Sequence, residues 1–424
     1  MATAGKGVMS FWRTMDVPRV VITGMGTINP LGLSVNQFWD GLVAGKSAIA
    51  PITRFDTSNF RVKVDAEVRG FDPALYMDPK VVDRTSRTIQ FAIAAAKEAV
   101  GSAGLDMTRE QAERVGVIIS TMTEQGYIIR GWEQFQRSGP RRADPLFITK
   151  SGASAASMQV GMMLGAKGPN NSVNSLCASG VDSIGTATNF IRLGHADVMI
   201  AGGSDGSLEP VSIAGMDVLG ALSRESDPAK ACRPFDLNRS GFVYGEGAGL
   251  VVLESYEHAV RRGAAILAEV AGVGWSFDAF DVTAPAPEAE AYAMRSALQS
   301  GGVAIEEVDY INAHGTSTKL NDACETKALK MVLGERAYKI PISSTKSMIG
   351  HVITAAGVIE TIAAILVMEK GIIHPTINYE TPDPECDLDY VPNVARPAEV
   401  NVCLKNSFGL GGENCSMALR RVTL

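Results

Sequence analysis

This chain of 424 residues has no closely spaced pair of cysteines, no excess of basic over acidic residues and no long apolar run. The six cysteines are scattered, with no CxxC pair and no Cys/His spacing typical of zinc, which favours a reduced, cytoplasmic setting. The formal net charge of −7 argues against nucleic acid as the main partner, because phosphate binding needs a clustered basic surface. No stretch has the roughly 20 unbroken apolar residues of a membrane span.

Aromatic residues are also few, at 6%, whereas glycine is abundant, at 43 residues. This balance favours an α/β protein with tight turns and close helix–sheet packing over an all-β sandwich. The chain is long enough for two ordinary domains or one large duplicated one. Residues 1–16 lack an apolar run long enough for a signal peptide, and we predict that they form a short disordered leader.

Short apolar runs alternate with helical patterns along the rest of the chain, as in α/β layers. The pattern restarts near residue 260, which predicts two similar halves, 17–265 and 266–424. The segments 174–187 and 346–360 support a duplication, because each is a polar, Gly-containing turn that leads into a helix of small residues. We predict buried strands at 17–28, 114–120, 197–201, 250–254 and 308–313, and helices that include 88–103 and 289–300.

Cys177 stands in NSLCASG, just before one of these small-residue helices. At a helix N-terminus the positive end of the macrodipole is expected to lower the pKa of the thiol. The first amides of the helix can also receive an oxyanion, and small neighbours leave room for an acyl thioester. A buried core cysteine is the commoner fate of a free cysteine, so the local sequence leaves both interpretations open.

Two of the five histidines lie at similar junctions. His314, in NAHGTST, follows a predicted strand and is expected to face the crevice where α/β sheets bind ligands. His351, in STKSMIGHVITAAG, precedes a small-residue helix. Each alone is compatible with an ordinary hydrogen-bonded histidine, but together with Cys177 they indicate one site.

Two further features support this site. A buried lysine needs a counter-ion, and Glu325, in NDACETK, is the predicted partner of Lys346. Three glycines in NSFGLGGEN (406–414) predict a loop whose backbone approaches a ligand closely, as a wall or an oxyanion donor.

Six motifs in one order give the chain, from about residue 17 to its end, a resemblance to the β-ketoacyl-acyl-carrier-protein synthases of fatty-acid synthesis. The resemblance implies the thiolase fold, in which two similar α/β halves pack as five α-β-α-β-α layers, and a homodimer. The motifs are the Cys-bearing segment, RPFDLNRSGFVYGEGAG (233–249), NAHGTSTxxxD (312–322), STKSMIGH (344–351), PTINYETPDPECDLDYVP (375–392) and SFGxGGxN (407–414).

The same resemblance implies a reaction and roles for the site residues. Cys177 would accept an acyl chain from acyl-carrier protein. His314 and His351 would hold malonyl-acyl-carrier protein, promote loss of CO2 and stabilise the enolate that attacks the acyl group. Lys346 and Glu325 match a supporting ion pair. No cofactor is implied, because the substrates carry their own phosphopantetheine.

Residues around the substrates and partners follow from the resemblance as well. Thr283, Thr316 and Thr318 match residues that hydrogen-bond the pantetheine arm, and Phe242 matches an aromatic residue near the malonyl carboxylate. Phe408 and Leu410 match positions in the glycine loop, and Met122 and Met216 match positions that line the acyl pocket. The amides of Cys177 and Leu410 would form the oxyanion hole. Lys80, Arg84, Arg141 and Arg142 match carrier-docking residues. No metal is required, although Asn312, Glu360 and Asn406 match side chains near a monovalent cation that some relatives hold.

Departures from the family pattern keep alternatives open. The family usually has Phe, a gate over the acyl pocket, where this chain has Leu410, and Asp281 and Glu413 also differ. A ketosynthase of a polyketide or polyene pathway is therefore an alternative. A coenzyme A thiolase would have a second cysteine just before the glycine loop, where this chain has Phe408. A non-catalytic partner subunit would typically lack the nucleophile.

Overall fold

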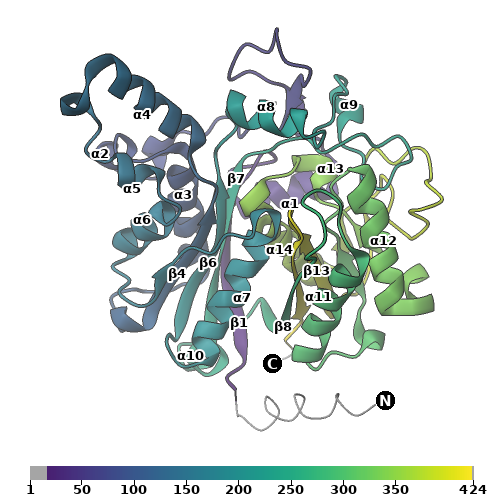
Figure 1. Ribbon diagram of the computed structural model, residues 1–424. Helices are drawn as coiled ribbons and strands as arrows, with labels where there is room; N and C mark the ends of the chain where they lie inside the picture. The colour runs from purple at the N-terminus through teal and green to yellow at the C-terminus, as the bar shows by residue number, and fades with distance from the viewer. Residues whose placement is uncertain (1–16, 423–424) are drawn as a thin grey trace.

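One ten-stranded sheet forms the centre of the molecule (Figure 1), and the structure, a computed structural model, describes residues 17–422. The predicted leader, 1–16, lies outside the described residues. One half of the sheet contains β1 (Val20–Ile28), β4 (Val115–Thr121), β5 (Asn170–Asn171), β6 (Val198–Asp205) and β7 (Gly247–Ser255). The other contains β8 (Ala268–Phe277), β9 (Tyr310–Asn312), β10 (Ile342–Ser343), β13 (Val402–Phe408) and β14 (Glu413–Arg420).

The two halves of the sheet repeat one topology. The full order is β10-β9-β13-β14-β8-β1-β7-β6-β4-β5, with β1 and β8 paired at the centre. When the strands of each half are numbered along the chain, both halves run 3-2-4-5-1 from the outer edge inward. The predicted duplication is therefore confirmed, while the boundary at 265/266 stays a prediction.

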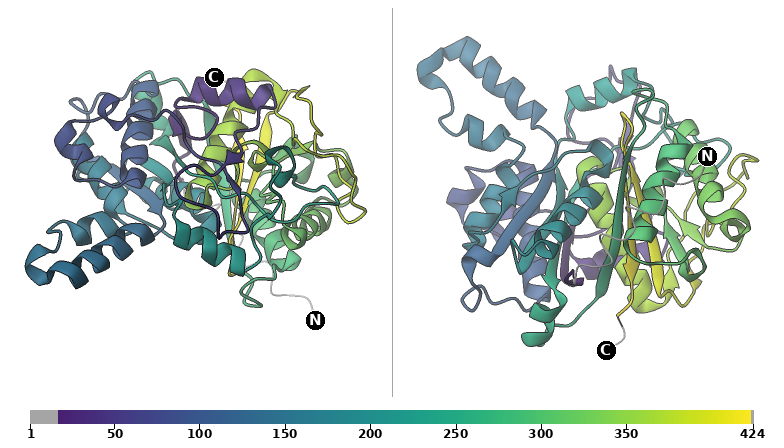
Figure 2. Two further views of the ribbon diagram at one scale, coloured as in Figure 1. Left: turned by 90° about the horizontal axis from the view of Figure 1, so that it is seen from above. Right: turned by 60° about the horizontal axis from the view of Figure 1, so that its bottom comes forward.

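Three layers of helices enclose the two half-sheets and give the five predicted layers (Figures 1 and 2). The first outer layer has α3 (Arg87–Ser102) and α6 (Ala155–Leu164), the middle layer α7 (Ser179–Arg192) and α14 (Ile353–Lys370), and the second outer layer α11 (Pro287–Ser300) and α12 (Lys319–Leu333). The predicted strands and helices are confirmed within a few residues.

The remaining elements lie around this frame. The other helices are α1 (Val35–Val43), α2 (Pro79–Val82), α4 (Gln125–Ser138), α5 (Phe147–Ser151), α8 (Pro210–Val218), α9 (Pro228–Ala231), α10 (Tyr256–Arg261) and α13 (Lys346–Ile349). Two small strand pairs join β2 (Ala50–Pro51) to β3 (Val64–Asp65) and β11 (Ile372–Ile373) to β12 (Arg396–Pro397).

Backbone contact between α7 and α14 explains the small residues at their N-termini. A Cβ atom on Gly180 would lie 2.6 Å from the backbone nitrogen of Val358, and one on Gly357 would lie 2.8 Å from that of Val181. Glycine is therefore required on both helices. The close packing fixes the N-terminal ends of the two helices beside each other.

Helix α14 is surrounded by protein, because every residue from Ile353 to Met368 is buried, and most of these residues are apolar or small. Across residues 17–422, no helix has both the length and the apolar character needed to cross a membrane.

Candidate active site

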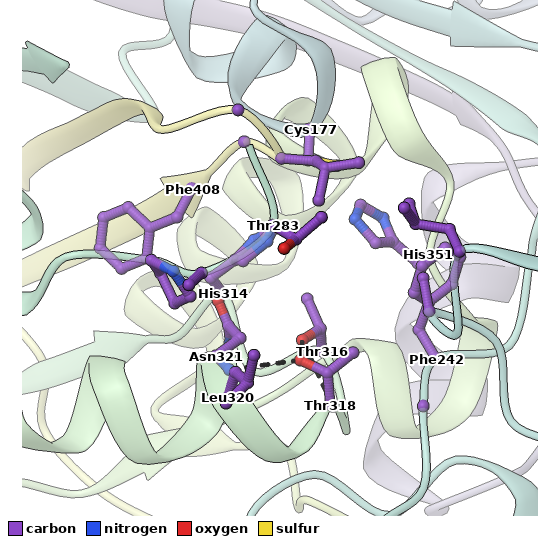
Figure 3. A pocket seen from close by; sticks show the side chains of 18 of the residues that line it. Cys177, Phe242, Thr283, His314, Thr316, Thr318, Leu320, Asn321, His351 and Phe408 are labelled. Carbon is purple, nitrogen blue, oxygen red and sulfur yellow. Dashed lines mark hydrogen bonds between the residues drawn. The ribbon is translucent and has the colours of Figure 1, made fainter. Parts of the chain in front are cut away.

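A cavity of about 370 Å³ lies where the two halves meet, at the starts of α7 and α14. Cys177, His314 and His351 all line it (Figure 3). Cys177 comes from the first half, whereas the two histidines come from the end of β9 and the turn before α14 in the second. The structure thus brings together the three residues that the sequence placed at separate junctions.

Cys177 is held in a tight 3₁₀ turn, Leu176–Ala178, that leads directly into α7. Leu176 has a φ of 48°, a left-handed conformation that is costly for a leucine. The turn is pinned, because the Leu176 amide donates to Asn174 Oδ1 at 3.0 Å and the Ser175 amide donates to Ser179 Oγ at 2.9 Å. The strained backbone presents the Cys177 side chain to the cavity.

The expectation that the helix N-terminus lowers the pKa of Cys177 is wrong for the resting site. Removal from water raises the pKa of the thiol to about 11, and this outweighs the opposing effects of the Leu410 amide and the Lys346 charge. The sulfur is therefore protonated at neutral pH. The backbone amides of Leu410 and of Cys177 itself both lower the pKa of the sulfur, so both lie beside it, which is the placement expected of oxyanion donors.

The glycine loop between β13 and β14 holds the Leu410 amide in place. Gly411 and Gly412 have φ values of 93° and 90°, which only glycine adopts without strain. A Cβ atom on Gly409 would lie 2.8 Å from the carbonyl oxygen of Ser175, in the cysteine turn. The loop can approach the cysteine turn this closely because residue 409 has no side chain.

Hydrogen bonds fix the same tautomer in both histidines. The Ile353 amide donates to His351 Nδ1 at 3.2 Å, and the Lys346 ammonium, which can only donate, lies 3.3 Å from His314 Nδ1. Each ring therefore carries its proton on Nε2. The ring centroids are 5.4 Å apart, and His351 Nε2 is buried without a hydrogen-bond partner among the described residues.

Both histidines are neutral. Burial lowers the pKa of His314 well below its ordinary value, and the charge of Lys346 lowers it further. Burial and Lys346 have the same effect on the pKa of His351, with a further contribution from Lys405. The site therefore offers two neutral N–H donors and no acidic imidazolium.

The predicted ion pair between Lys346 and Glu325 is wrong. Lys346 Nζ lies 2.5 Å from Glu360 Oε1, on α14, and donates to the His314 carbonyl oxygen at 2.7 Å. Glu325 instead accepts from the amides of His314 at 2.9 Å and Gly315 at 2.8 Å, so it anchors the histidine turn. The second half contains both carboxylates, and only tertiary packing decides which of them meets the lysine.

Lys405, on β13, is a buried charge that the sequence reasoning missed. Its Nζ lies 2.7 Å from Glu360 Oε2, so Glu360 bridges two ammonium groups. A lysine inside the apolar strand VCLKNSF is the signal that would have found it. The site predicted near Asn312, Glu360 and Asn406 does not fit a monovalent cation, because the ammonium of Lys405 already contacts the Glu360 carboxylate and the Asn406 carbonyl oxygen.

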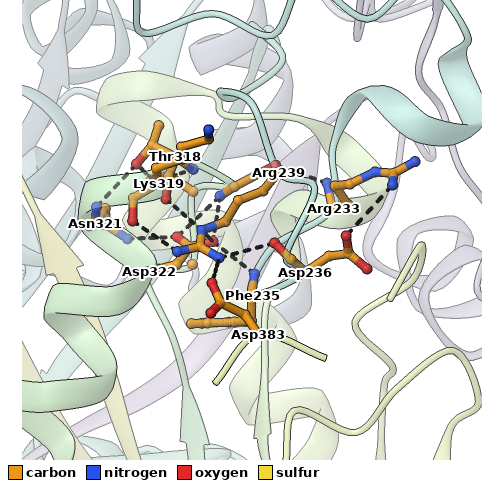
Figure 4. Close-up of polar contacts among 12 residues, drawn as sticks. Arg233, Phe235, Asp236, Arg239, Thr318, Lys319, Asn321, Asp322 and Asp383 are labelled. Carbon is orange, nitrogen blue, oxygen red and sulfur yellow. Dashed lines mark hydrogen bonds and ion pairs between the residues drawn. The ribbon is translucent and has the colours of Figure 1, made fainter. Parts of the chain in front are cut away.

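A second buried network, also missed, fixes the wall of the cavity next to His314 (Figure 4). Arg239 pairs with Asp383 and donates to the carbonyl oxygens of Thr318 at 3.1 Å and Lys319 at 2.9 Å. Asp322 accepts from the Phe235 amide at 2.8 Å. These contacts connect the motif at 233–249 to the turn that carries Thr316 and Thr318, which are predicted to bind the pantetheine arm.

Seven of the eight residues predicted to contact the substrate line the cavity, and their roles stay predictions. Thr283, Thr316, Thr318, Phe242, Phe408, Leu410 and Met216 line the cavity. Met122 is not among its lining residues and packs in the apolar cluster that also contains Cys177 and Phe242. The hydroxyls of Thr316 and Thr318 are 2.8 Å apart. Leu219, Leu320 and Asn321 also line the cavity and were not predicted.

The predicted carrier-docking residues are exposed and lie outside the cavity. Lys80 and Arg84 lie in and just after α2, and Arg141 and Arg142 lie in the turn after α4. Both segments are on the same side of the molecule (Figure 1). None of the four lines the cavity, and their docking role stays a prediction.

Comparison with known proteins gives the class of this fold and site. Residues 18–259 match the family model of the β-ketoacyl synthase N-terminal domain, and residues 267–380 match that of the C-terminal domain. A solved β-ketoacyl synthase from Burkholderia phymatum superposes with a TM-score of 0.89 at 33% identity, covering 96% of this chain and 100% of its own. The chain therefore belongs to the β-ketoacyl synthase family, and its five layers are the thiolase fold.

Individual relatives are similar to this chain over nearly their whole length. The chain is 46% identical to 3-oxoacyl-[acyl-carrier-protein] synthase 2 of Coxiella burnetii, over 96% of this chain and 100% of that protein. It is 42% identical to the enzyme of the same name from Synechocystis, over 96% and 99% of the two chains. A type II polyketide ketosynthase solved with its acyl-carrier protein has a TM-score of 0.89 at 36% identity, over 96% and 100%.

Proposed function

We propose that the protein is a 3-oxoacyl-[acyl-carrier-protein] synthase, which condenses an acyl group held on Cys177 with malonyl-acyl-carrier protein and lengthens fatty acyl chains by two carbons. The observation that carries this proposal is the cavity itself, where one cysteine faces two neutral histidines with fixed tautomers. The relatives named 3-oxoacyl-[acyl-carrier-protein] synthase 2 support the choice of substrates.

In the first step Cys177 takes the acyl group from its carrier. The sulfur attacks the thioester carbon, and the amides of Cys177 and Leu410 receive the negative charge on the oxygen. The carrier thiol then leaves as the tetrahedral intermediate collapses. Because the pKa of Cys177 is raised to about 11, its proton departs during the attack and returns to the leaving thiolate.

In the second step the histidines act on the malonyl group. The Nε2–H groups of His314 and His351 donate to the thioester oxygen of malonyl-acyl-carrier protein, and CO2 leaves as the charge moves onto that oxygen. The carbon of the enolate attacks the acyl group on Cys177 and expels the thiolate. The Phe242 ring lies 5.1 Å from the His351 ring, and its apolar face disfavours the charged carboxylate over neutral CO2.

The remaining assignments belong to the same proposal. Thr283, Thr316 and Thr318 bind the pantetheine arm, because they line the cavity and present hydroxyl groups. Lys80, Arg84, Arg141 and Arg142 attract the acidic carrier protein. The enzyme works in the cytoplasm as a homodimer and needs no cofactor beyond the phosphopantetheine on its substrates.

A polyketide ketosynthase is a second candidate. Two solved neighbours favour it: the type II polyketide ketosynthase, and a ketosynthase/chain length factor for ishigamide with a TM-score of 0.88 at 38% identity. Leu410, smaller than the phenylalanine of the family, is the feature of the cavity that would admit a less regular chain.

Intact mass spectrometry distinguishes the two candidates. The protein is incubated with acyl-carrier proteins bearing saturated, unsaturated and β-keto chains, and malonyl-carrier is then added. We expect one saturated acyl group on Cys177, discharged as a 3-oxoacyl product two carbons longer. Loading by β-keto or polyene chains alone would favour the polyketide candidate. If no acyl adduct forms on the wild type, or if the same adduct forms on Cys177→Ala, both candidates are contradicted.

A further inference from the structure

The ammonium of Lys405 contacts two buried oxygen atoms. Lys405 is fully buried, its Nζ lies 2.7 Å from Glu360 Oε2, and it donates to the carbonyl oxygen of Asn406. Asn312 lies directly opposite Lys405 on the paired strand β9, and its Oδ1 is buried without a hydrogen-bond partner among the described residues. A carboxylate, a carbonyl and an amide oxygen are the ligands that hard cations take in proteins.

Lys405 connects to the reacting groups through two intermediaries. Glu360 joins Lys405 to Lys346, and Lys346 in turn contacts both the Nδ1 and the carbonyl oxygen of His314. All four groups are buried, so water does not screen their charges. The positive charge beside Glu360 therefore affects how Lys346 is held and how His314 is oriented.

We propose that Lys405 is a built-in monovalent cation, whose ammonium takes the place of a potassium or ammonium ion at Glu360 and makes the site independent of cations in solution. Lys405 is a positioning residue, because it acts on His314 only through Glu360 and Lys346. The effect on catalysis rests on the proposed function, whereas the cation-like role at Glu360 does not.

The proposal differs from an ordinary buried ion pair in one measurable respect. Truncation of the side chain to alanine would leave the oxygen atoms and a space that a small cation can enter. Methionine would fill the same space without a charge. An ordinary ion pair predicts the same loss for both variants, whereas a built-in cation predicts that small cations restore only Lys405→Ala.

The experiment measures melting temperature and CO2 release from malonyl-carrier at one ionic strength, in potassium, ammonium or tetramethylammonium chloride. Wild type and Lys339→Ala, which changes an exposed lysine, should behave alike in all three salts. Lys405→Ala should melt on the order of 2 °C higher in potassium or ammonium than in tetramethylammonium. Its CO2 release should also recover by roughly tenfold or more. Lys405→Met should gain from none of them.

Three results would overturn the proposal. The first is a wild type whose melting temperature or rate depends on potassium. The second is a Lys405→Ala protein that melts alike in all three salts or does not fold even in potassium. The third is an equal recovery of Lys405→Met. If the melting temperature of Lys405→Ala recovers in the small cations but the wild type condenses no acyl group, the proposed function is refuted and the cation assignment stands.

Discussion

Helices α7 and α14 hold equivalent places in the two halves of the molecule, and both begin at the cavity. Their surroundings differ. The start of α7 carries Cys177 in an apolar cluster with Met216 and Phe242, which keeps the thiol protonated. The turn before α14 carries His351, near the buried charges of Lys346 and Glu360. One duplicated frame thus supplies the covalent nucleophile from one half and the electrostatic control from the other.

Removal of the nucleophile of the first half should have the largest effect on the rate of condensation. Cys177→Ala should lower the rate of condensation by at least ~10³-fold, because Cys177 is the only cysteine among the residues that line the cavity. Product formation from acyl- and malonyl-carrier measures it. Cys403→Ala, which changes a buried cysteine away from the cavity, is the control. Comparable losses in both variants would show that the effect is structural.

Removal of one histidine should separate the two steps. His351→Ala should reduce CO2 release about 10²- to 10³-fold, as expected for the loss of one oxyanion donor, while Cys177 still accepts acyl groups. Radiolabelled CO2 and the intact mass of the acylated protein report the two steps independently. The exposed His195 gives the control variant His195→Ala. If acyl transfer and CO2 release fall together, the assignment of tasks to the two halves fails.

Neutralisation of Glu360 tests the charges of the second half. Glu360→Gln leaves Lys346 and Lys405 buried without their shared counter-ion, so the free energy of unfolding should fall by about 3–5 kcal/mol. Urea denaturation measures this fall. Glu369→Gln, on the exposed part of the same helix, should change it by no more than about 0.5 kcal/mol. Equal stability of the two variants would contradict the central place given to Glu360.

The last expected effect is confined to one side chain and concerns the pH dependence of alkylation at Cys177. Because its pKa is raised to about 11, the thiolate is scarce at neutral pH, and alkylation should accelerate about tenfold per pH unit from pH 7 to 10. The rate should level off only near pH 11. Iodoacetamide labelling followed by mass spectrometry, with Cys177→Ala to subtract other sites, gives the profile. A plateau below pH 8 would contradict the raised pKa and support the lowered pKa that the helix N-terminus alone would give.

The sequence was informative where a feature is local. Apolar periodicity predicted the strands and the helices α3 and α11, and the scarcity of histidine made His314 and His351 stand out. It failed where the outcome depends on packing. The partner of Lys346 is Glu360 because α14 passes beside it. Desolvation outweighs the helix macrodipole at Cys177 because the apolar cluster around it comes from several distant segments.

The most direct test of the division between the halves is CO2 release from malonyl-carrier by Cys177→Gln, alone and combined with His314→Ala. Glutamine cannot form a thioester, yet it leaves the histidine pair intact. We predict that Cys177→Gln still releases CO2 and that the double variant loses this release by at least ~10²-fold. Equal CO2 release by both proteins would show that the histidines do not carry the decarboxylation and would contradict the account.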